Sequence, residues 1–176
     1  MKRGVLITAV VATAYTLAAL IYTLLPPLDF LDSVRGGVYT AYFTWGLVSA
    51  DGSHAYAEFH GYKIAVNLWK VVICDPSGVC RSQEINAIAM YLGLKASGAL
   101  AVESTGQRCY AVKLRPTEFA GHVISFDGEV CLNPDGSPRR ISGVFTLDGK
   151  TWRLADSPQR VDKVFLFDSY YKIHGD

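Results

Sequence analysis

The chain contains four cysteines, which are its most reactive side chains: Cys74, Cys80, Cys109 and Cys131. An even number of cysteines is first interpreted as disulfides, which persist in oxidising compartments. Cys74 and Cys80 flank the segment Asp-Pro-Ser-Gly-Val, in which proline and glycine favour a reverse turn. That turn would bring the two sulfurs together, so we predict a Cys74–Cys80 disulfide.

The pairing of the other two cysteines follows from strand alternation. Residues 107–114 and 122–132 both alternate apolar and polar side chains, and Cys109 and Cys131 each fall on the more polar face. An antiparallel hairpin with Cys109 opposite Cys131 also pairs charge with charge and core with core, namely Lys113 with Asp127 and Leu114 with Phe126. We therefore predict a Cys109–Cys131 disulfide.

A four-cysteine metal site is the alternative to two disulfides. Zinc sites of this kind use short Cys-x-x-Cys pairs, whereas here five residues separate the first two cysteines and twenty-one separate the last two. Disulfides are the better interpretation. They favour an exported domain without proving it, because hyperthermophiles also form disulfides in the cytosol.

The histidines offer a weaker suggestion of chemistry. His54 and His60, with Glu58 between them, fall on one face of a predicted strand and could hold a metal. No third ligand is indicated, solvated strand residues give the same pattern, and His174 lies in a tail expected to fray. The sequence also contains no G-x-S-x-G, H-E-x-x-H or phosphate-binding glycine motif. We expect neither an enzyme nor a bound metal or cofactor.

The charge balance limits the kinds of partner. The chain has 17 basic and 16 acidic residues, and without Lys2 and Arg3 the basic count is 17 − 2 = 15. Such a nearly neutral domain has no basic surface for a phosphate backbone, so we expect no nucleic-acid partner.

Alternation of apolar and polar residues predicts that strands make up most of the domain. They cover residues 38–48, 55–59, 62–73, 107–114, 122–132, 140–147, 150–154 and 161–171. A slip in the alternation near Trp69 predicts a β-bulge, and Asp148 with Gly149 predicts a two-residue hairpin turn.

One segment has the spacing of a helix instead. Apolar residues three and four positions apart predict a helix from Arg81 to Leu94, with Ser82 as its cap and Gly93 as its stop. The expected fold class is α+β and mainly β: an antiparallel, strongly curved sheet, half-barrel or barrel-like, with one helix packed on it.

The N-terminal segment predicts where this domain lies. Residues 4–25 are apolar and uncharged, and as a helix they would reach roughly 33 Å, enough to span a bilayer. Lys2 and Arg3 precede the stretch, which places the N-terminus in the cytoplasm and the rest outside. The alternative is a cleaved secretory signal, for which Ala18 and Ala19 offer a weak cleavage position.

The expected domain organisation follows. Residues 1–27 form an uncleaved N-terminal anchor, residues 28–35 a short linker, and residues 36–176 an extracytoplasmic, mainly β domain. The chain would be a single-pass membrane protein whose partner is the lipid bilayer through residues 4–25. If the segment is cleaved, the domain is secreted.

Several segments resemble the LolA and LppX type of exported lipoprotein carriers. They are ICDPSGVC, GQRCYAVKL, GEVCLNPDGSPRRISGVF and GKTWRL, and the resemblance spans residues 36–172. It implies a half-barrel that shelters an apolar ligand. The chain departs from the pattern because no lipobox cysteine follows the apolar run, and an uncleaved anchor would prevent free shuttling between membranes.

The resemblance further implies a concave face that binds a lipid or another apolar ligand. For this face the chain offers eight aromatic residues: Tyr39, Phe43, Trp45, Phe59, Tyr110, Phe126, Phe145 and Trp152. The alternative is that they form the core of a sandwich or barrel, which needs about that many large side chains. A second candidate function is a non-catalytic structural or accessory subunit of a cell-envelope assembly, which would bind an envelope protein partner through an exposed strand edge.

Overall fold

The structure of the protein is a computed structural model, and it describes residues 37–175. Within this range the chain is mainly β, with twelve strands and two helices. None of the helices in residues 37–175 has the length and apolar character needed to cross a bilayer. The predicted anchor at 4–25 and the linker at 28–35 lie outside the described residues.

The strands form two antiparallel sheets. Sheet A has the order β12-β1-β2-β3-β4-β5-β6, and sheet B has the order β11-β10-β9-β8-β7. The strands of sheet A are β1 (Tyr39–Phe43), β2 (Gly46–Ala50), β3 (Ala55–Phe59), β4 (Tyr62–Val66), β5 (Lys70–Cys74), β6 (Cys80–Glu84) and β12 (Arg160–Asp162). Those of sheet B are β7 (Leu100–Gly106), β8 (Cys109–Phe119), β9 (His122–Leu132), β10 (Pro138–Leu147) and β11 (Lys150–Asp156).

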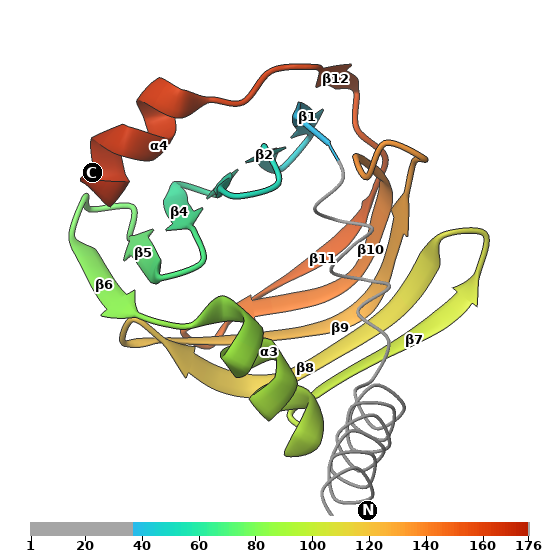
Figure 1. The fold of residues 1–176 in the computed structure, drawn as a ribbon, viewed down its shortest axis with the longest axis horizontal. Coiled ribbons are helices and arrows are strands. Elements are labelled where there is room, and N and C mark those ends of the chain that lie inside the picture. The colour runs from blue at the N-terminus through green and yellow to red at the C-terminus, as the bar shows by residue number, and fades with distance from the viewer. Residues whose placement is uncertain (1–36, 176) are drawn as a thin grey trace, which may run out of the picture. The chain divides into compact units, whose positions relative to one another are not determined.

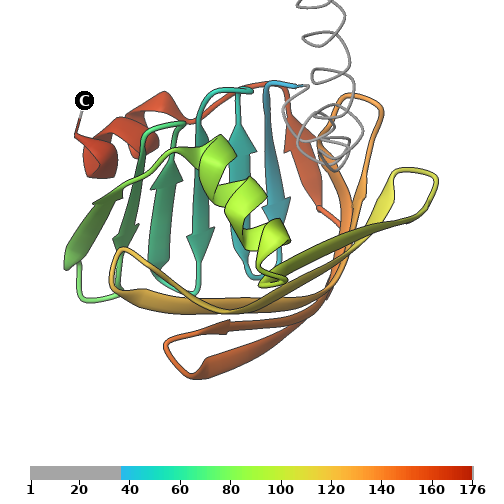
Figure 2. The ribbon, with the colours of Figure 1, turned by 60° about the horizontal axis from the view of Figure 1, so that its bottom comes forward.

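The two helices pack in different places. Helix α4 (Phe167–His174) lies on the outer side of sheet A, whereas α3 (Ala87–Ala96) connects β6 to β7 on the side where sheet B lies (Figure 1). Turning the molecule shows α3 crossing in front of the strands of sheet A (Figure 2). Tyr56 and Ala65 on the outer face of sheet A pack against Phe165 and Tyr170.

The inner face of sheet A packs against sheet B. Tyr39, Ala41 and Phe43 of β1 form a buried cluster that Ile141 of sheet B contacts. A second cluster joins Ile73 of sheet A to the β8–β9 hairpin of sheet B. The core of the domain therefore lies between the two sheets.

Tight turns set the register of the hairpins. At Asp148 (φ 51°) and Gly149 (φ 78°) both central residues have positive φ, which matches the right-handed twist of the paired strands. This confirms the predicted two-residue hairpin, in which Phe145 lies opposite Trp152.

Both predicted disulfides are present. Cys74 is bonded to Cys80, and Cys109 is bonded to Cys131. The β8–β9 register also pairs Lys113 with Asp127, whose charged groups lie 3.0 Å apart. All four sulfurs are bonded in pairs, so the alternative of a four-cysteine metal site is excluded in this oxidation state.

Residues 38–48 form a hairpin and not the predicted single strand. β1 ends at Phe43 and β2 begins at Gly46. The Asp156 carboxylate accepts hydrogen bonds from the Thr44 backbone N–H (2.9 Å) and hydroxyl (2.6 Å) at the turn. Asp156 lies 112 residues further along the chain, so its effect on this turn is invisible in the local sequence.

The slip in alternation near Trp69 marks a reverse turn and not a β-bulge. The Asn67 side-chain oxygen accepts hydrogen bonds from the backbone N–H groups of Trp69 and Lys70, each 2.8 Å long. This is the usual way in which asparagine stabilises a turn. The turn divides the predicted strand 62–73 into β4 and β5.

The first helix starts later than predicted. Residues 80–84 pair with β5 as β6, because the Cys74–Cys80 hairpin holds them beside that strand. Asn86, not Ser82, caps α3, since its side chain accepts the Ala89 N–H at 3.0 Å. The helix continues past Gly93 to Ala96.

The C-terminal run 161–171 is not the predicted core strand. Only β12 is extended, and α4 follows it because Phe165 and Tyr170 pack together on sheet A. His174 ends this helix with only 2% of its surface exposed, so the tail does not fray as expected. Strand β7 was not predicted either. The described fold thus has a second helix and two sheets, neither closed nor strongly curled, in place of one strongly curved sheet with one helix.

Candidate functional site

The eight aromatic residues predicted for an apolar ligand face come together between the sheets. Seven of them lie on the facing sides of sheets A and B, and Trp45 lies in the turn between β1 and β2. Tyr39, Phe43, Phe59 and Tyr110 are buried, and the other four are half-buried.

Phe59 is the centre of the ring contacts in this group. Its ring centroid lies 5.4 Å from Trp45, 5.0 Å from Phe145 and 5.0 Å from Trp152. Phe43 stacks on Trp45 at 4.5 Å. Most of these contacts have edge-to-face or tilted geometry, which aromatic pairs favour in protein cores. Five of the eight rings therefore pack on one another between the sheets.

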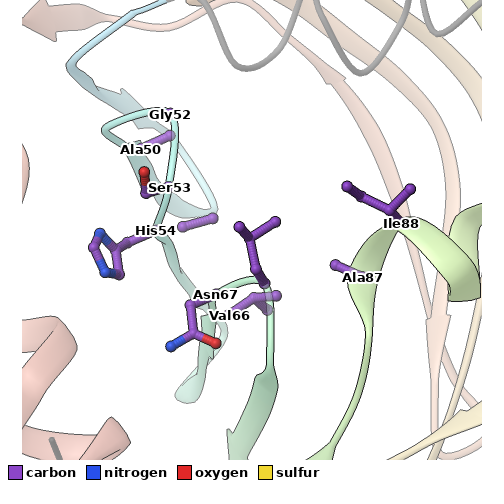
Figure 3. Close-up of a pocket in the computed structure, with 10 residues that line it drawn as sticks. Ala50, Gly52, Ser53, His54, Val66, Asn67, Ala87 and Ile88 are labelled. Atoms are coloured by element: carbon purple, nitrogen blue, oxygen red, sulfur yellow. The ribbon is translucent and has the colours of Figure 1, made fainter.

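An apolar cavity of about 200 Å³ lies elsewhere, where sheet A meets the start of α3 (Figure 3). Six apolar residues line it: Ala50, Ala55, Val66, Leu68, Ala87 and Ile88. Gly52, Ser53, His54 and Asn67 complete the lining. Figure 3 shows Ala87 and Ile88 on α3, across the gap from Val66 on β4.

Small side chains at neighbouring register positions create this cavity. Ala50 pairs with Ala55, and Ala55 pairs with Val66, so the three residues lie side by side on the inner face of sheet A. Alanine leaves a hollow there that a larger side chain would fill. The cavity residues were not predicted, because their only sequence signal is alanine at inward positions, and that signal requires the register and the place of α3.

A fixed loop forms one wall of the cavity. The Asp51 carboxylate accepts hydrogen bonds from the backbone N–H groups of Ser53 (2.9 Å) and His54 (2.7 Å) and lies 2.9 Å from His54 Nδ1. Burial alone would raise the pKa of Asp51, but the hydrogen bonds from His54 and Ser53 hold it below its ordinary value. The carboxylate therefore stays ionised at neutral pH and holds the loop in place.

Large apolar side chains are exposed beside the cavity. Ile88, which lines it, is 42% exposed, and Trp69, next to the lining residue Leu68, is 61% exposed. Exposed apolar residues that border a hollow are a common feature of ligand and partner sites.

The structure does not bring the predicted histidine pair together. The His54 ring packs against Tyr170 of α4, with the ring centroids 5.1 Å apart. The His60 ring stacks on Trp152 of sheet B at 5.5 Å. The two rings lie on opposite sides of sheet A, so they cannot share a metal.

Comparisons with known proteins give no family for the chain. No protein-family model matches it, and a search of curated proteins finds no relative.

Proposed function

We propose that this domain binds a small apolar ligand in the cavity between sheet A and α3. The observation that supports the proposal best is the apolar lining of that cavity, which consists of Val66, Leu68, Ile88 and three alanines. Mainly apolar walls with a few polar groups are typical of ligand sites. The ligand class is the one expected from the sequence, but the site differs from the aromatic residues first predicted for it.

The volume limits the size of the ligand. An enclosed cavity of about 150 Å³ lined by apolar side chains can bind benzene, and sites for larger ligands usually measure about 300–1,000 Å³. At about 200 Å³, this cavity accommodates one ring or a short alkyl segment, not a whole lipid. Each buried CH₂ contributes about 0.8 kcal/mol, so affinity should rise about fourfold per methylene until the cavity is full.

Binding of n-alkanols of increasing length to the full chain tests this proposal. With ¹³C-labelled alanine methyl groups, we expect the signals of Ala50, Ala55 and Ala87 to shift, because these residues line the cavity. We also expect affinity to increase with chain length and then level off. If these signals do not respond to any alkanol, the cavity is not a binding site.

A matched pair of substitutions on α3 provides the control. Ala87 lines the cavity, whereas Ala89 is exposed on the same helix and does not. Ala87→Leu should fill the cavity and weaken alkanol binding at least tenfold, while Ala89→Leu should bind as the wild type does. Equal binding by both variants would contradict the proposed site.

We further propose that residues 4–25 anchor the domain in the membrane, with the N-terminus in the cytoplasm. The two disulfides indicate an oxidising, extracytoplasmic environment for the domain. The intact mass of the protein from a membrane fraction tests the anchor. Retention of residues 1–27 is expected, whereas a mature chain that begins just after Ala19 would support the cleaved, secreted alternative.

The resemblance to LolA and LppX carriers extends the proposal to acyl chains. A short alkyl segment at the end of an acyl chain has the size and polarity that the cavity accepts. Native mass spectrometry of the full chain tests this extension, and the expected result is co-purified lipid at one molecule per chain. Alkanol binding without any bound lipid would support the cavity but contradict the carrier role.

A second candidate function, as an envelope subunit, has its own support at the edge of sheet B. In the described range β7 pairs only with β8, and its residues 103–106 are exposed. Such an edge can accept a strand from a partner protein. Stable co-purification with envelope proteins, lost when proline replaces Ser104, would favour this function.

A further inference from the structure

The Cys109–Cys131 disulfide lies in a basic hollow on the outer face of sheet B. The hollow measures about 300 Å³ and is lined by Cys109, Cys131, Arg139, Arg140 and Ser157. The two cysteines are opposite each other in β8 and β9, and Arg140 of β10 lies opposite Cys131. A disulfide and two arginines thus share one surface depression.

The charges around the two sulfurs are arranged asymmetrically. Arg139 Nη2 lies 3.3 Å from Cys109 Sγ, and Arg139 forms no ion pair with a carboxylate in residues 37–175. Glu129 Oε2 lies 3.6 Å from Cys131 Sγ and is paired with Arg140. Hydrogen bonds from Arg140 and Thr105 keep the pKa of Glu129 below its ordinary value, so it is ionised at neutral pH. Arg139 also interacts with Glu129 at longer range, but its guanidinium makes no direct ion pair, so an accessible positive charge lies beside Cys109.

The exposure of the two sulfurs also favours attack at Cys109. Cys131 is only 2% exposed, whereas Cys109 is half-buried. Thiol–disulfide exchange begins when a thiolate attacks one sulfur of the bond and expels the other. An incoming thiolate can reach Cys109, and the Arg139 guanidinium would attract this anion to that sulfur.

We propose that the Cys109–Cys131 bond is a thiol-exchange site for a small thiol that carries a carboxylate or sulfonate group. The thiolate attacks Cys109 Sγ, a new S–S bond forms between the small thiol and Cys109, and the Cys109–Cys131 bond breaks. Cys131 leaves as a thiolate and takes a proton from solvent. The acidic group of the small thiol binds in the hollow beside Arg139 and Arg140. Because Cys131 stays next to Cys109, the reverse reaction restores the disulfide.

The second disulfide provides an internal reference. Cys80 is exposed, and the Gly78 carbonyl oxygen lies 3.7 Å from its sulfur. In the described residues no arginine donates to either sulfur of the Cys74–Cys80 bond. Cys80 also lines a hollow with Lys70 and Arg81, but Lys70 Nζ donates to the His174 carbonyl and Arg81 Nη1 to the Gly121 carbonyl. A neutral thiol can attack both disulfides, and Cys109–Cys131, where a guanidinium lies against the sulfur, should show the stronger preference for an anionic thiol.

Exchange rates of the full chain with 2-mercaptoethanesulfonate and with neutral 2-mercaptoethanol test the proposal. Samples are trapped by alkylation, and the peptides containing each disulfide are quantified by mass spectrometry. The ratio of the two rates should be about fivefold higher at Cys109–Cys131 than at Cys74–Cys80, as expected for one charge pair near 4 Å in water. The preference should fall as ionic strength rises, and the mixed disulfide should be on Cys109.

Variants of Arg139 identify the charge responsible. Arg139→Gln should abolish the preference, and Arg139→Lys should retain most of it. Arg153→Gln, which removes an exposed arginine of β11 outside the hollow, should leave it unchanged. Equal rate ratios at the two disulfides, an unchanged preference in the Arg139→Gln variant, or a mixed disulfide on Cys131 would each overturn the proposal.

Discussion

Replacing Phe59 with alanine distinguishes the two interpretations of the aromatic residues between the sheets. Phe59 is 5% exposed and makes ring contacts with Trp45, Phe145 and Trp152. If these rings are the core, Phe59→Ala leaves a cavity and removes several favourable aromatic contacts. If they are an open ligand face, the substitution should change the free energy of unfolding only slightly.

The structure predicts a large effect. Truncating a buried phenylalanine to alanine costs about 3–5 kcal/mol in the free energy of unfolding. For a domain of this size, each kcal/mol lowers the melting temperature by roughly 3–4 °C. A loss of about 4 kcal/mol therefore corresponds to a decrease of roughly 12–16 °C.

Urea unfolding of the full chain with intact disulfides measures this cost, followed by circular dichroism and tryptophan fluorescence. Phe167→Ala is the matched control, because Phe167 is 47% exposed on α4 and should cost about 1 kcal/mol or less. If Phe59→Ala costs no more than Phe167→Ala, the rings do not form the core. The aromatic surface would then be the ligand face that the sequence suggested.

Two further predictions concern a turn and a strand pair. Hydrogen bonds from Thr44 hold the pKa of Asp156 in the folded protein below its ordinary value. The ionised carboxylate therefore stabilises the fold above about pH 4, the pKa of the unfolded chain. This stabilisation is lost as the pH falls through the lower pKa of the folded state. Asp156→Asn should therefore reduce the difference between the urea midpoints measured at about pH 5 and about pH 2.5; an unchanged difference would contradict the turn contact. A Cβ at Gly128 would lie 2.6 Å from the Gly143 Cα and too close to the neighbouring carbonyl oxygen, so Gly128→Ala should lower the melting temperature. Gly93→Ala, in open space on α3, should raise the melting temperature, because alanine is more favourable than glycine in a helix by up to about 1 kcal/mol. A lower melting temperature for both variants would contradict this prediction.

Elements formed by neighbours in the chain were predictable. The Asp148–Gly149 turn and the Cys74–Cys80 disulfide depend on short connections. The Cys109–Cys131 pairing followed from the alternation of side chains and from the match of Lys113 with Asp127. A two-residue turn fixes which residues face each other in the β10–β11 hairpin. In the β8–β9 hairpin the register shifts by one residue between Leu114 and Thr117, so the turn alone would not have paired the cysteines. The facing positions of the aromatic residues follow from the same alternation.

Other features required the tertiary structure. The turn at Thr44 depends on Asp156, and β12 pairs with β1 from the opposite end of the described chain. The apolar run near Phe165 fits a strand as well as a helix start, and its packing on sheet A decides the outcome.

The sequence by its own pattern was enough to show which side chains share a face in β8–β11 and which cysteines pair, because side chains alternate along a strand and cysteines and charges match across the pair. The tertiary structure was needed to show that two sheets form, that aromatic rings from both sheets pack between them, and that the cavity lies beside α3. Alternation shows that a face is apolar but not what covers it, since the covering elements come from distant parts of the chain.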